Sequence, residues 1–389
     1  MAGTRPRRLA GMAGIGVDAI GAAADALGDP SVLRFENLDT DLRPHPVVID
    51  ATRRALVDDR NNSYLPFVGQ ARLREAAAAH VSRLSGVPYS ATRNVIISAG
   101  GLSGILNVLL ALIDTGDEVV LTDPTYIGLI NRVRLAGGVP RLAAFTKDRG
   151  EWRLDLGALR AAVTPQTRAL LMMSPSMPSG AVLRRDDWEV IAGLARERDL
   201  WLIYDAAMER ILYDGRAYVH PASLPGAADC VVTVGAASKE LRMIGWRVGW
   251  IVAPERLMAD LALVSMGNVV VPVGIAQEAA AVALELGDAD VQAAVAEWGR
   301  RRDALLGELT GLPAVIPGGG WSLLVDGAPL GLTGAEMSRR LLARAGVAAT
   351  PMDGWGEVNG GQFLRFVFAN EPVERIRGAG ARIRAALGV

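Results

Sequence analysis

Lys239 is the residue whose type and position most directly suggest covalent chemistry. The chain contains 41 lysines and arginines, yet only Lys147 and Lys239 are lysines. A lysine amine can form an imine with a carbonyl compound once it has lost its proton, whereas an arginine cannot. Lys147 lies in the polar stretch 146–150, where we predict a solvated turn. Lys239 follows an apolar run and small residues, so it could project into a cleft; an ordinary surface lysine is the alternative.

Two neighbouring patterns suggest an anion site. Arg247 follows Lys239 by eight residues and could return to the same pocket to clamp an anion with two hydrogen bonds, unless it is purely structural. The glycine-rich segment 98–104 follows a predicted strand and opens a predicted helix. Its glycines would let the backbone approach a phosphate, and the free N–H groups of Gly101 and Leu102 would bind it. Such turns are also common without any ligand.

Three further side chains are expected to need a partner. Asp205 ends an apolar run, so a buried carboxylate there requires a cation, unless it caps the following helix. Arg365 lies in an alternating apolar pattern and should meet an anion, either a ligand or an acid of the chain. Tyr126 follows a proline turn and could stack on a flat ring or simply belong to the core.

The elements that must position these residues alternate along the chain. Apolar runs predict strands and amphipathic segments predict helices. This alternation is typical of a mostly parallel sheet covered by helices on both faces, with sites beyond the carboxyl ends of the strands. After residue 272 the pattern predicts a smaller α+β unit. The predicted strands are 95–98, 118–122, 169–173, 200–204, 231–234, 248–252, 318–326 and 363–369, and the main helices are 102–113, 125–136, 186–198 and 290–309.

Composition excludes several classes of function. The net charge is −1, with both signs mixed along the chain, so neither a nucleic acid nor a membrane surface is expected as partner. The single cysteine, Cys230, cannot build a disulfide framework, and the three histidines lack the spacing of a zinc site, so no metal is expected. No long apolar run predicts a membrane span, which favours a cytoplasmic enzyme.

Ser238-Lys239 with the later Gly245-Trp246-Arg247-Val248-Gly249 resembles the lysine motif of the class I/II aminotransferases of fold type I, which use pyridoxal 5′-phosphate (PLP). The other segments stand in the order of that family, from Tyr64 to Arg365. The resemblance implies an α/β PLP-transferase type I fold, with a mostly parallel, seven-stranded-type sheet between helices and a smaller α+β domain. We expect 1–60 to form an N-terminal arm and part of the small domain, 61–290 the large PLP-binding domain, and 291–389 the C-terminal small domain.

The resemblance also implies roles for single residues. Lys239 would hold PLP as a Schiff base and then move the proton between the substrate Cα and the cofactor. Arg365 would bind the substrate α-carboxylate. Asn37 lies in the acidic segment 35–41, which is expected near the substrate side chain and hints at a polar or cationic substrate group, although its acids could equally be solvated. In the cofactor site, Asp205 would contact the ring nitrogen and Tyr126 the face of the ring. The cofactor phosphate would be bound by Gly101, Leu102, Ser238 and Arg247. Tyr64 would reach the phosphate of the PLP bound to the neighbouring subunit, which implies a homodimer with shared sites.

Two positions depart from the family pattern. Where the family has an asparagine and a tyrosine that donate hydrogen bonds to the phenolic oxygen of the cofactor, this chain has Met177 and Met208. A thioether donates no hydrogen bond. The loss of both donors should favour the protonated Schiff base, unless water or another side chain replaces them.

The expected reaction is transfer of an amino group from an L-amino acid to a 2-oxo acid. The methionine pair keeps a second possibility open, a PLP-dependent lyase or oxidase. A non-catalytic PLP-binding regulator is the third, disfavoured because Lys239 is retained and no basic DNA-binding segment is appended.

Overall fold

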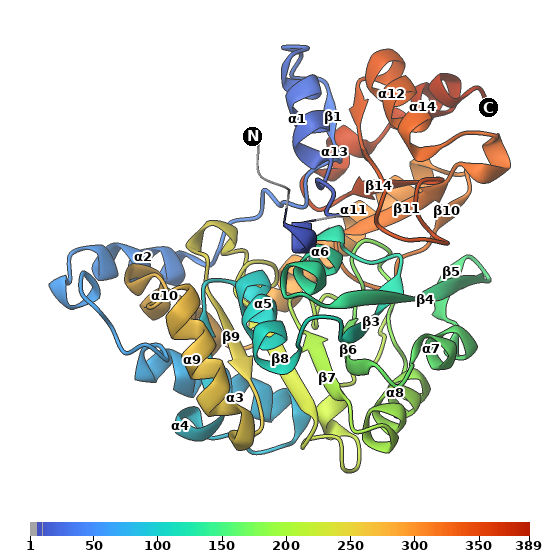
Figure 1. Cartoon of the computed structure of the whole chain (residues 1–389). Coiled ribbons are helices and arrows are strands. Elements are labelled where there is room, and N and C mark those ends of the chain that lie inside the picture. Colours follow the sequence, from blue (N-terminus) through green and yellow to red (C-terminus); the bar gives the residue numbers. More distant parts are fainter. Residues whose placement is uncertain (1–5, 10) are drawn as a thin grey trace, which may run out of the picture.

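The computed structural model describes residues 6–9 and 11–389. Its centre is an eight-stranded sheet with the order β2-β9-β8-β7-β6-β3-β4-β5 (Figure 1). The neighbours from β8 to β4 are parallel, β9 runs antiparallel to β2 and β8, and β5 runs antiparallel to β4. The bounds are β2 (Val95–Ser98), β3 (Glu118–Asp123), β4 (Val139–Asp148), β5 (Glu151–Leu154), β6 (Thr167–Met173), β7 (Trp201–Asp205), β8 (Val231–Ala236) and β9 (Gly249–Val252).

The central strands are apolar on both faces because helices cover both. Along β7, Ile203 packs toward α5, whereas Leu202 and Tyr204 pack into the core on the opposite side. One face is covered by α5 (Gly101–Leu112), α6 (Ile127–Leu135) and α9 (Met258–Asn268). The other is covered by α2 (Pro46–Leu56), α3 (Ala71–Ser85), α7 (Leu156–Ala162), α8 (Arg185–Glu197) and α10 (Gly274–Glu285), with the short α4 (Ala91–Asn94) beside α3.

The last quarter of the chain forms a second, smaller layer (Figure 1, orange to red). Its sheet has the order β10-β11-β14-β13. The segment with α1 and β1 joins it, since β1 pairs in parallel with β12. The elements are α1 (Val17–Asp25), β1 (Leu33–Arg34), α11 (Ala289–Glu308), β10 (Ala314–Val315), β11 (Ser322–Asp326), α12 (Gly334–Ala345), β12 (Val347–Ala348), β13 (Thr350–Pro351), β14 (Phe363–Val367), α13 (Val373–Ile376) and α14 (Ala379–Leu387).

The α/β fold with a mostly parallel sheet between helices is confirmed, and β5 adds an eighth strand at the edge of the expected seven. The interpretation of 146–150 as a turn is wrong for Lys147, which lies in β4; its side chain is exposed, as expected, and forms an ion pair with Asp326. The pattern failed there because β4 and β5 form an exposed hairpin whose outer residues are polar. The domain bounds at 60 and 290 stay a prediction. No helix of the described residues is long and apolar enough to cross a membrane.

Candidate active site

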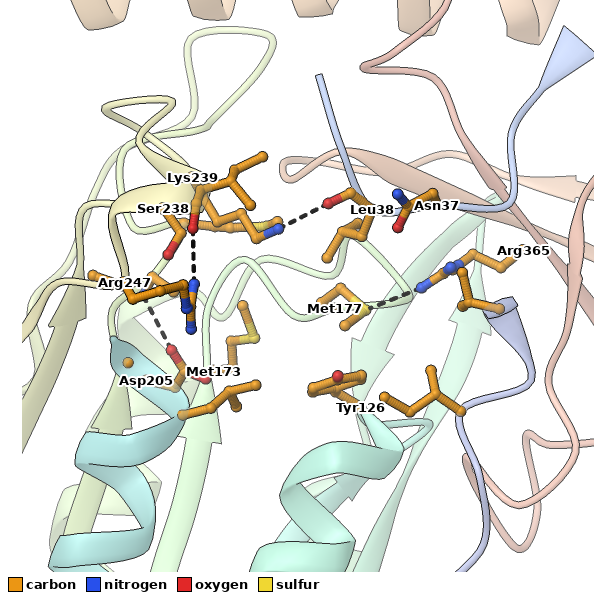
Figure 2. A pocket seen from close by; sticks show the side chains of 18 of the residues that line it. Asn37, Leu38, Tyr126, Met173, Met177, Asp205, Ser238, Lys239, Arg247 and Arg365 are labelled. Carbon is orange, nitrogen blue, oxygen red and sulfur yellow. Dashed lines mark hydrogen bonds between the residues drawn. The ribbon is translucent and has the colours of Figure 1, made fainter. Parts of the chain in front are cut away.

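A cavity of about 280 Å³ lies beyond the carboxyl ends of three central strands. Met173, Asp205 and Ala236 end β6, β7 and β8, and Gly101 opens α5 across from them. The other wall comes from the N-terminal arm and from β14 (Figure 2). Every residue predicted for the site except Tyr64 lines this cavity, namely Asn37, Gly101, Leu102, Tyr126, Asp205, Ser238, Lys239, Arg247 and Arg365.

Lys239 projects into the cavity from the segment that follows β8 (Figure 2). Its Nζ donates a hydrogen bond to the carbonyl oxygen of Leu38 at 2.9 Å and lies 4.9 Å from the centre of the Trp321 ring. Burial lowers the pKa of Lys239 to about 8; the cations Arg365 and Arg247 add to this shift, while Asp39 opposes it. An amine of this kind is partly unprotonated near neutral pH, as a nucleophile must be.

Asp205 is a buried carboxylate that forms no ion pair within the part of the chain that the structure describes. It is the last residue of β7 and is only 4% exposed. Its Oδ1 accepts a hydrogen bond from the N–H of Ala207 at 3.1 Å, and no cation of the described residues forms an ion pair with it. Burial raises the pKa of Asp205 to about 6, although that hydrogen bond and the more distant Arg132 lower it. A cationic ring nitrogen beside Asp205 would stabilise the charged form of the carboxylate, which burial disfavours.

A cradle for an anion surrounds the start of α5. Gly100 has φ +91°, and Gly101 and Leu102 follow as the first residues of the helix, whose N–H groups have no partner within it. A Cβ at Gly100 would lie 2.6 Å from Nη2 of Arg247, so glycine lets the guanidinium approach the helix start. Arg247 donates through Nη1 to the carbonyl of Ile244 at 2.9 Å, and Ser238 lines the same side. Backbone N–H groups, a hydroxyl and a guanidinium together suit a phosphate.

Arg365 lies fully buried in β14, at 1% exposure. Its Nη2 donates to the carbonyl of Glu36 and, at 3.3 Å, to Oγ1 of Thr350, while Nη1 lies 3.8 Å from the sulfur of Met177 (Figure 2). Nε has no hydrogen-bond partner among the described residues, and none of their carboxylates pairs with this arginine. Burial lowers its pKa to about 10. The described residues therefore form no salt bridge with Arg365, contrary to the alternative considered from the sequence. Its guanidinium remains available to an anion in the cavity.

Two tryptophans pack against side chains that line the cavity. The Tyr126 ring lines the cavity and packs against Trp355, with ring centres 5.4 Å apart. Trp355 also lies 4.9 Å from the guanidinium of Arg365, and Trp321 lies against Lys239. The two tryptophans and Arg132, whose Nε donates to the carbonyl of Leu102 at 2.7 Å, were missed by the sequence reasoning. A glycine run at 318–320 was the only signal near Trp321.

The methionines that depart from the family pattern line the cavity. Met177 and Met208 are both buried there, together with Met173 at the end of β6. In the acidic segment, Asn37 reaches the cavity, but two of the acids are taken up elsewhere. Glu36 pairs with Arg34 and Asp41 with Arg301, each at 2.6 Å, so neither is free to meet a substrate cation.

Tyr64 is the predicted residue that the structure does not bring to this cavity. It is 85% exposed on the loop before α3. Its predicted contact lies in a neighbouring subunit, so its exposure in a single chain leaves that role a prediction.

Comparison with known proteins identifies the family to which the chain belongs. Residues 34–383 match the family model described as aminotransferase class I and II. The chain is 34% identical over 352 residues to arginine–pyruvate transaminase AruH of Pseudomonas aeruginosa, covering 90% of this chain and 86% of that protein. It is 36% identical over 311 residues to aspartate/prephenate aminotransferase of Thermus thermophilus, covering 78% of each. N-succinyldiaminopimelate aminotransferase of Mycobacterium tuberculosis superposes with a TM-score of 0.92 at 30% identity, over 98% of this chain and 100% of that one. The chain therefore belongs to the class I/II aminotransferases, which are PLP-dependent enzymes.

Proposed function

We propose that this enzyme moves the amino group of an L-amino acid to a 2-oxo acid with Lys239 as its covalent and proton-transferring residue. The observation that carries the proposal is the placing of three groups on one cavity: the amine of Lys239, the unpaired carboxylate of Asp205 and the unpaired guanidinium of Arg365. When bound, PLP supplies an electron sink that stabilises negative charge at the substrate Cα.

Different residues around the cavity would bind different groups of the cofactor. Asp205 would pair with the ring nitrogen, and the Tyr126 ring would pack on the ring face. The N–H groups of Gly101 and Leu102 would hold the phosphate, together with the side chains of Ser238 and Arg247.

Lys239 and Arg365 would act on the substrate. Arg365 would bind the α-carboxylate and so fix the orientation of the Cα–H bond. The Lys239 amine would take the proton from Cα and return a proton in the second half of the reaction. Its pKa of about 8 suits both directions near neutral pH.

The methionine pair predicts an unusual cofactor spectrum. Met177 and Met208 line the cavity and donate no hydrogen bond. The linkage between Lys239 and the cofactor should therefore stay protonated across the neutral range, as a pH titration of the cofactor absorbance can measure. Met177→Asn and Met208→Tyr should each lower the pKa of this linkage, and their effects should be non-additive if they act on one oxygen. If the double variant titrates like the parent, the two methionines do not face the cofactor.

A lyase or an oxidase remains the second candidate because of this methionine pair. The relatives named above are aminotransferases, which favours transamination. A panel of amino donors and oxo acceptors distinguishes the reactions. Transamination forms a new amino acid and a new oxo acid in equal amounts. Release of ammonia without an acceptor, or formation of hydrogen peroxide, would overturn it.

A cytoplasmic homodimer with shared sites completes the proposal. Exposed apolar side chains lie at the end of α2, in the loop before α3, and along and just after α9, including Leu56, Val57, Phe67, Leu263 and Val270. Phe67 and Val270 border one small hollow together with Ser98 and Ala99, directly before the phosphate cradle. A second copy bound over this surface would bring its Tyr64 close to the cradle.

Tyr64→Phe should weaken PLP binding without dissociating the dimer. One hydrogen bond to a charged group is worth roughly 1.5–3 kcal/mol, or about 10- to 150-fold in the dissociation constant. Equilibrium dialysis of PLP measures the change, and sedimentation gives the assembly. A wild-type monomer that binds PLP fully would contradict the shared site.

A further inference from the structure

Asp18 is the one charged residue of the cavity wall that neither the cofactor nor the substrate α-carboxylate accounts for. The wall carries three cations and two acids, Lys239, Arg247, Arg365, Asp205 and Asp18. In the proposed function the first four are assigned to the proton transfer, the phosphate, the α-carboxylate and the ring nitrogen. The remaining acid lies in the first turn of α1, far from the others in sequence.

The N-terminal arm that carries Asp18 is held in place by contacts with α6. The side-chain amide of Asn131 donates to the carbonyl of Ala13 at 2.8 Å, and Arg134 donates to the carbonyl of Gly11 at 2.6 Å. The next residues of the arm, Ile15 and Val17, reach the cavity beside Asp18. The hydrogen bonds between the arm and α6 therefore fix the position of Asp18 at the cavity.

The Asp18 carboxylate is exposed and forms no ion pair or hydrogen bond with the described residues. It lies close enough to Tyr126 to add to the raised pKa of that hydroxyl, for which burial is the main cause. Among the other acids of the arm near the cavity, Glu36 pairs with Arg34 and Asp41 with Arg301, while Asp39 acts on Lys239 and does not line the cavity. A solvated acid at a helix start also stabilises the helix, but that role alone does not require it to face the cavity.

The residues around Asp18 suit a substrate side chain that has an aliphatic stem and a cationic end. Ile15 and Val17 offer apolar contact for methylene groups, and Asp18, the next residue after Val17, lines the same cavity. A second carboxylate on the substrate would instead meet the negative charge of Asp18. Neither arginine that this chain contributes to the wall is left to bind it, since Arg247 and Arg365 are both assigned.

We propose that Asp18 is a specificity-determining residue that selects amino donors with a cationic side chain. The inference rests on the proposed transamination and adds the class of donor. A guanidinium or ammonium group at the end of the substrate side chain would pair with Asp18 while Arg365 holds the α-carboxylate. Together, the two contacts would favour donors whose side chain has a matching length and a positive charge.

The test compares L-arginine with L-citrulline, whose neutral urea group has nearly the shape of guanidinium. We expect kcat/KM of the holoenzyme to favour L-arginine by about tenfold, the lower end of the range for a hydrogen bond to a charged group. Asp18→Asn should lower kcat/KM for L-arginine by that factor, mainly through KM, and leave L-citrulline unchanged. Asp18→Glu should keep part of the preference. Asp25→Asn is the matched control, since Asp25 ends the same helix, pairs with Arg34 at 2.7 Å and does not line the cavity.

Binding without turnover gives an independent measurement. The probe 5-guanidinopentanoate carries the carboxylate and the guanidinium of arginine but no amino group to react. Its dissociation constant, measured by calorimetry, should rise about tenfold in Asp18→Asn, whereas that of hexanoate should not change. Turnover of neutral or acidic donors in preference to L-arginine, or an unchanged arginine-to-citrulline ratio in Asp18→Asn, would overturn the role of Asp18 and leave transamination standing. Failure to transaminate any donor would overturn the proposed function itself.

Discussion

Lys239→Ala is expected to reduce turnover by several orders of magnitude and to remove the absorbance of the lysine-linked cofactor. The amine is the nucleophile that holds the cofactor and the group that moves the Cα proton, so a single substitution removes both functions. Its hydrogen bond to Leu38 and its contact with Trp321 are small parts of the packing, so the folded structure should persist. Steady-state kinetics and an absorbance spectrum of the purified variant measure the two effects.

Lys147→Ala and Lys239→Arg are the controls for this variant. Lys147 lies in β4, pairs with Asp326 and is remote from the cavity wall, so its loss should leave kinetics and spectrum nearly unchanged. Lys239→Arg keeps a cation in the pocket but cannot form the linkage, so it should be as inactive as the alanine variant. Retention of the lysine-linked band in Lys239→Ala would sink the assignment.

Asp205→Asn is expected to cause the second largest loss, about 10²-fold or more in kcat/KM. The substitution keeps the size of the side chain and an oxygen for the N–H of Ala207, but removes the negative charge. Removing one partner of a buried ion pair typically costs about 3–5 kcal/mol, and here the uncompensated charge would be the ring nitrogen. Weaker PLP binding should accompany the loss of activity, and equilibrium dialysis measures it.

Asp187→Asn provides a matched buried carboxylate outside the site. Asp187 is also buried, but it accepts a hydrogen bond from the N–H of Arg184 at the start of α8. Its loss should cost about 1 kcal/mol of stability and leave PLP affinity unchanged. Equal effects of the two substitutions on PLP affinity would show that Asp205 acts through the fold and not through the cofactor.

The pH dependence of cofactor binding follows from the same residue. Burial raises the pKa of Asp205 to about 6 in the protein without cofactor. The carboxyl group is charged above this pH and becomes neutral as the pH falls through it. The affinity of the wild type relative to Asp205→Asn should therefore be greatest above pH 6 and decline below it.

The sequence predicted the buried strands and the residues at their ends, because both leave a local signal. Strands apolar on both faces, such as β7, read as continuous hydrophobic runs. Asp205 and Lys239 lie just after such runs, where a polar group stands out. The exposed hairpin of β4 and β5 left no such run, so it was missed and Lys147 was misplaced.

The rest of the site depends on contacts between distant segments. Asp18 and Lys239 meet at one cavity although more than two hundred residues separate them, and nothing in the local pattern around Asp18 predicts this. The expected anion for Arg365 followed from the cost of burying a guanidinium. Only the structure shows that its neighbours are a carbonyl, a hydroxyl and a thioether, so that no carboxylate of the described residues pairs with its charge.

Borohydride reduction of the holoenzyme followed by peptide mapping tests the central assignment most directly. Reduction makes the bond between the lysine and the cofactor permanent, and trypsin no longer cleaves at the modified residue. The two lysines fall on different tryptic peptides, residues 142–149 for Lys147 and residues 217–242 for Lys239. We expect the phosphopyridoxyl group on residues 217–242, at Lys239 and in near-stoichiometric amount. Its recovery on residues 142–149, or on neither peptide, would contradict the assignment of Lys239.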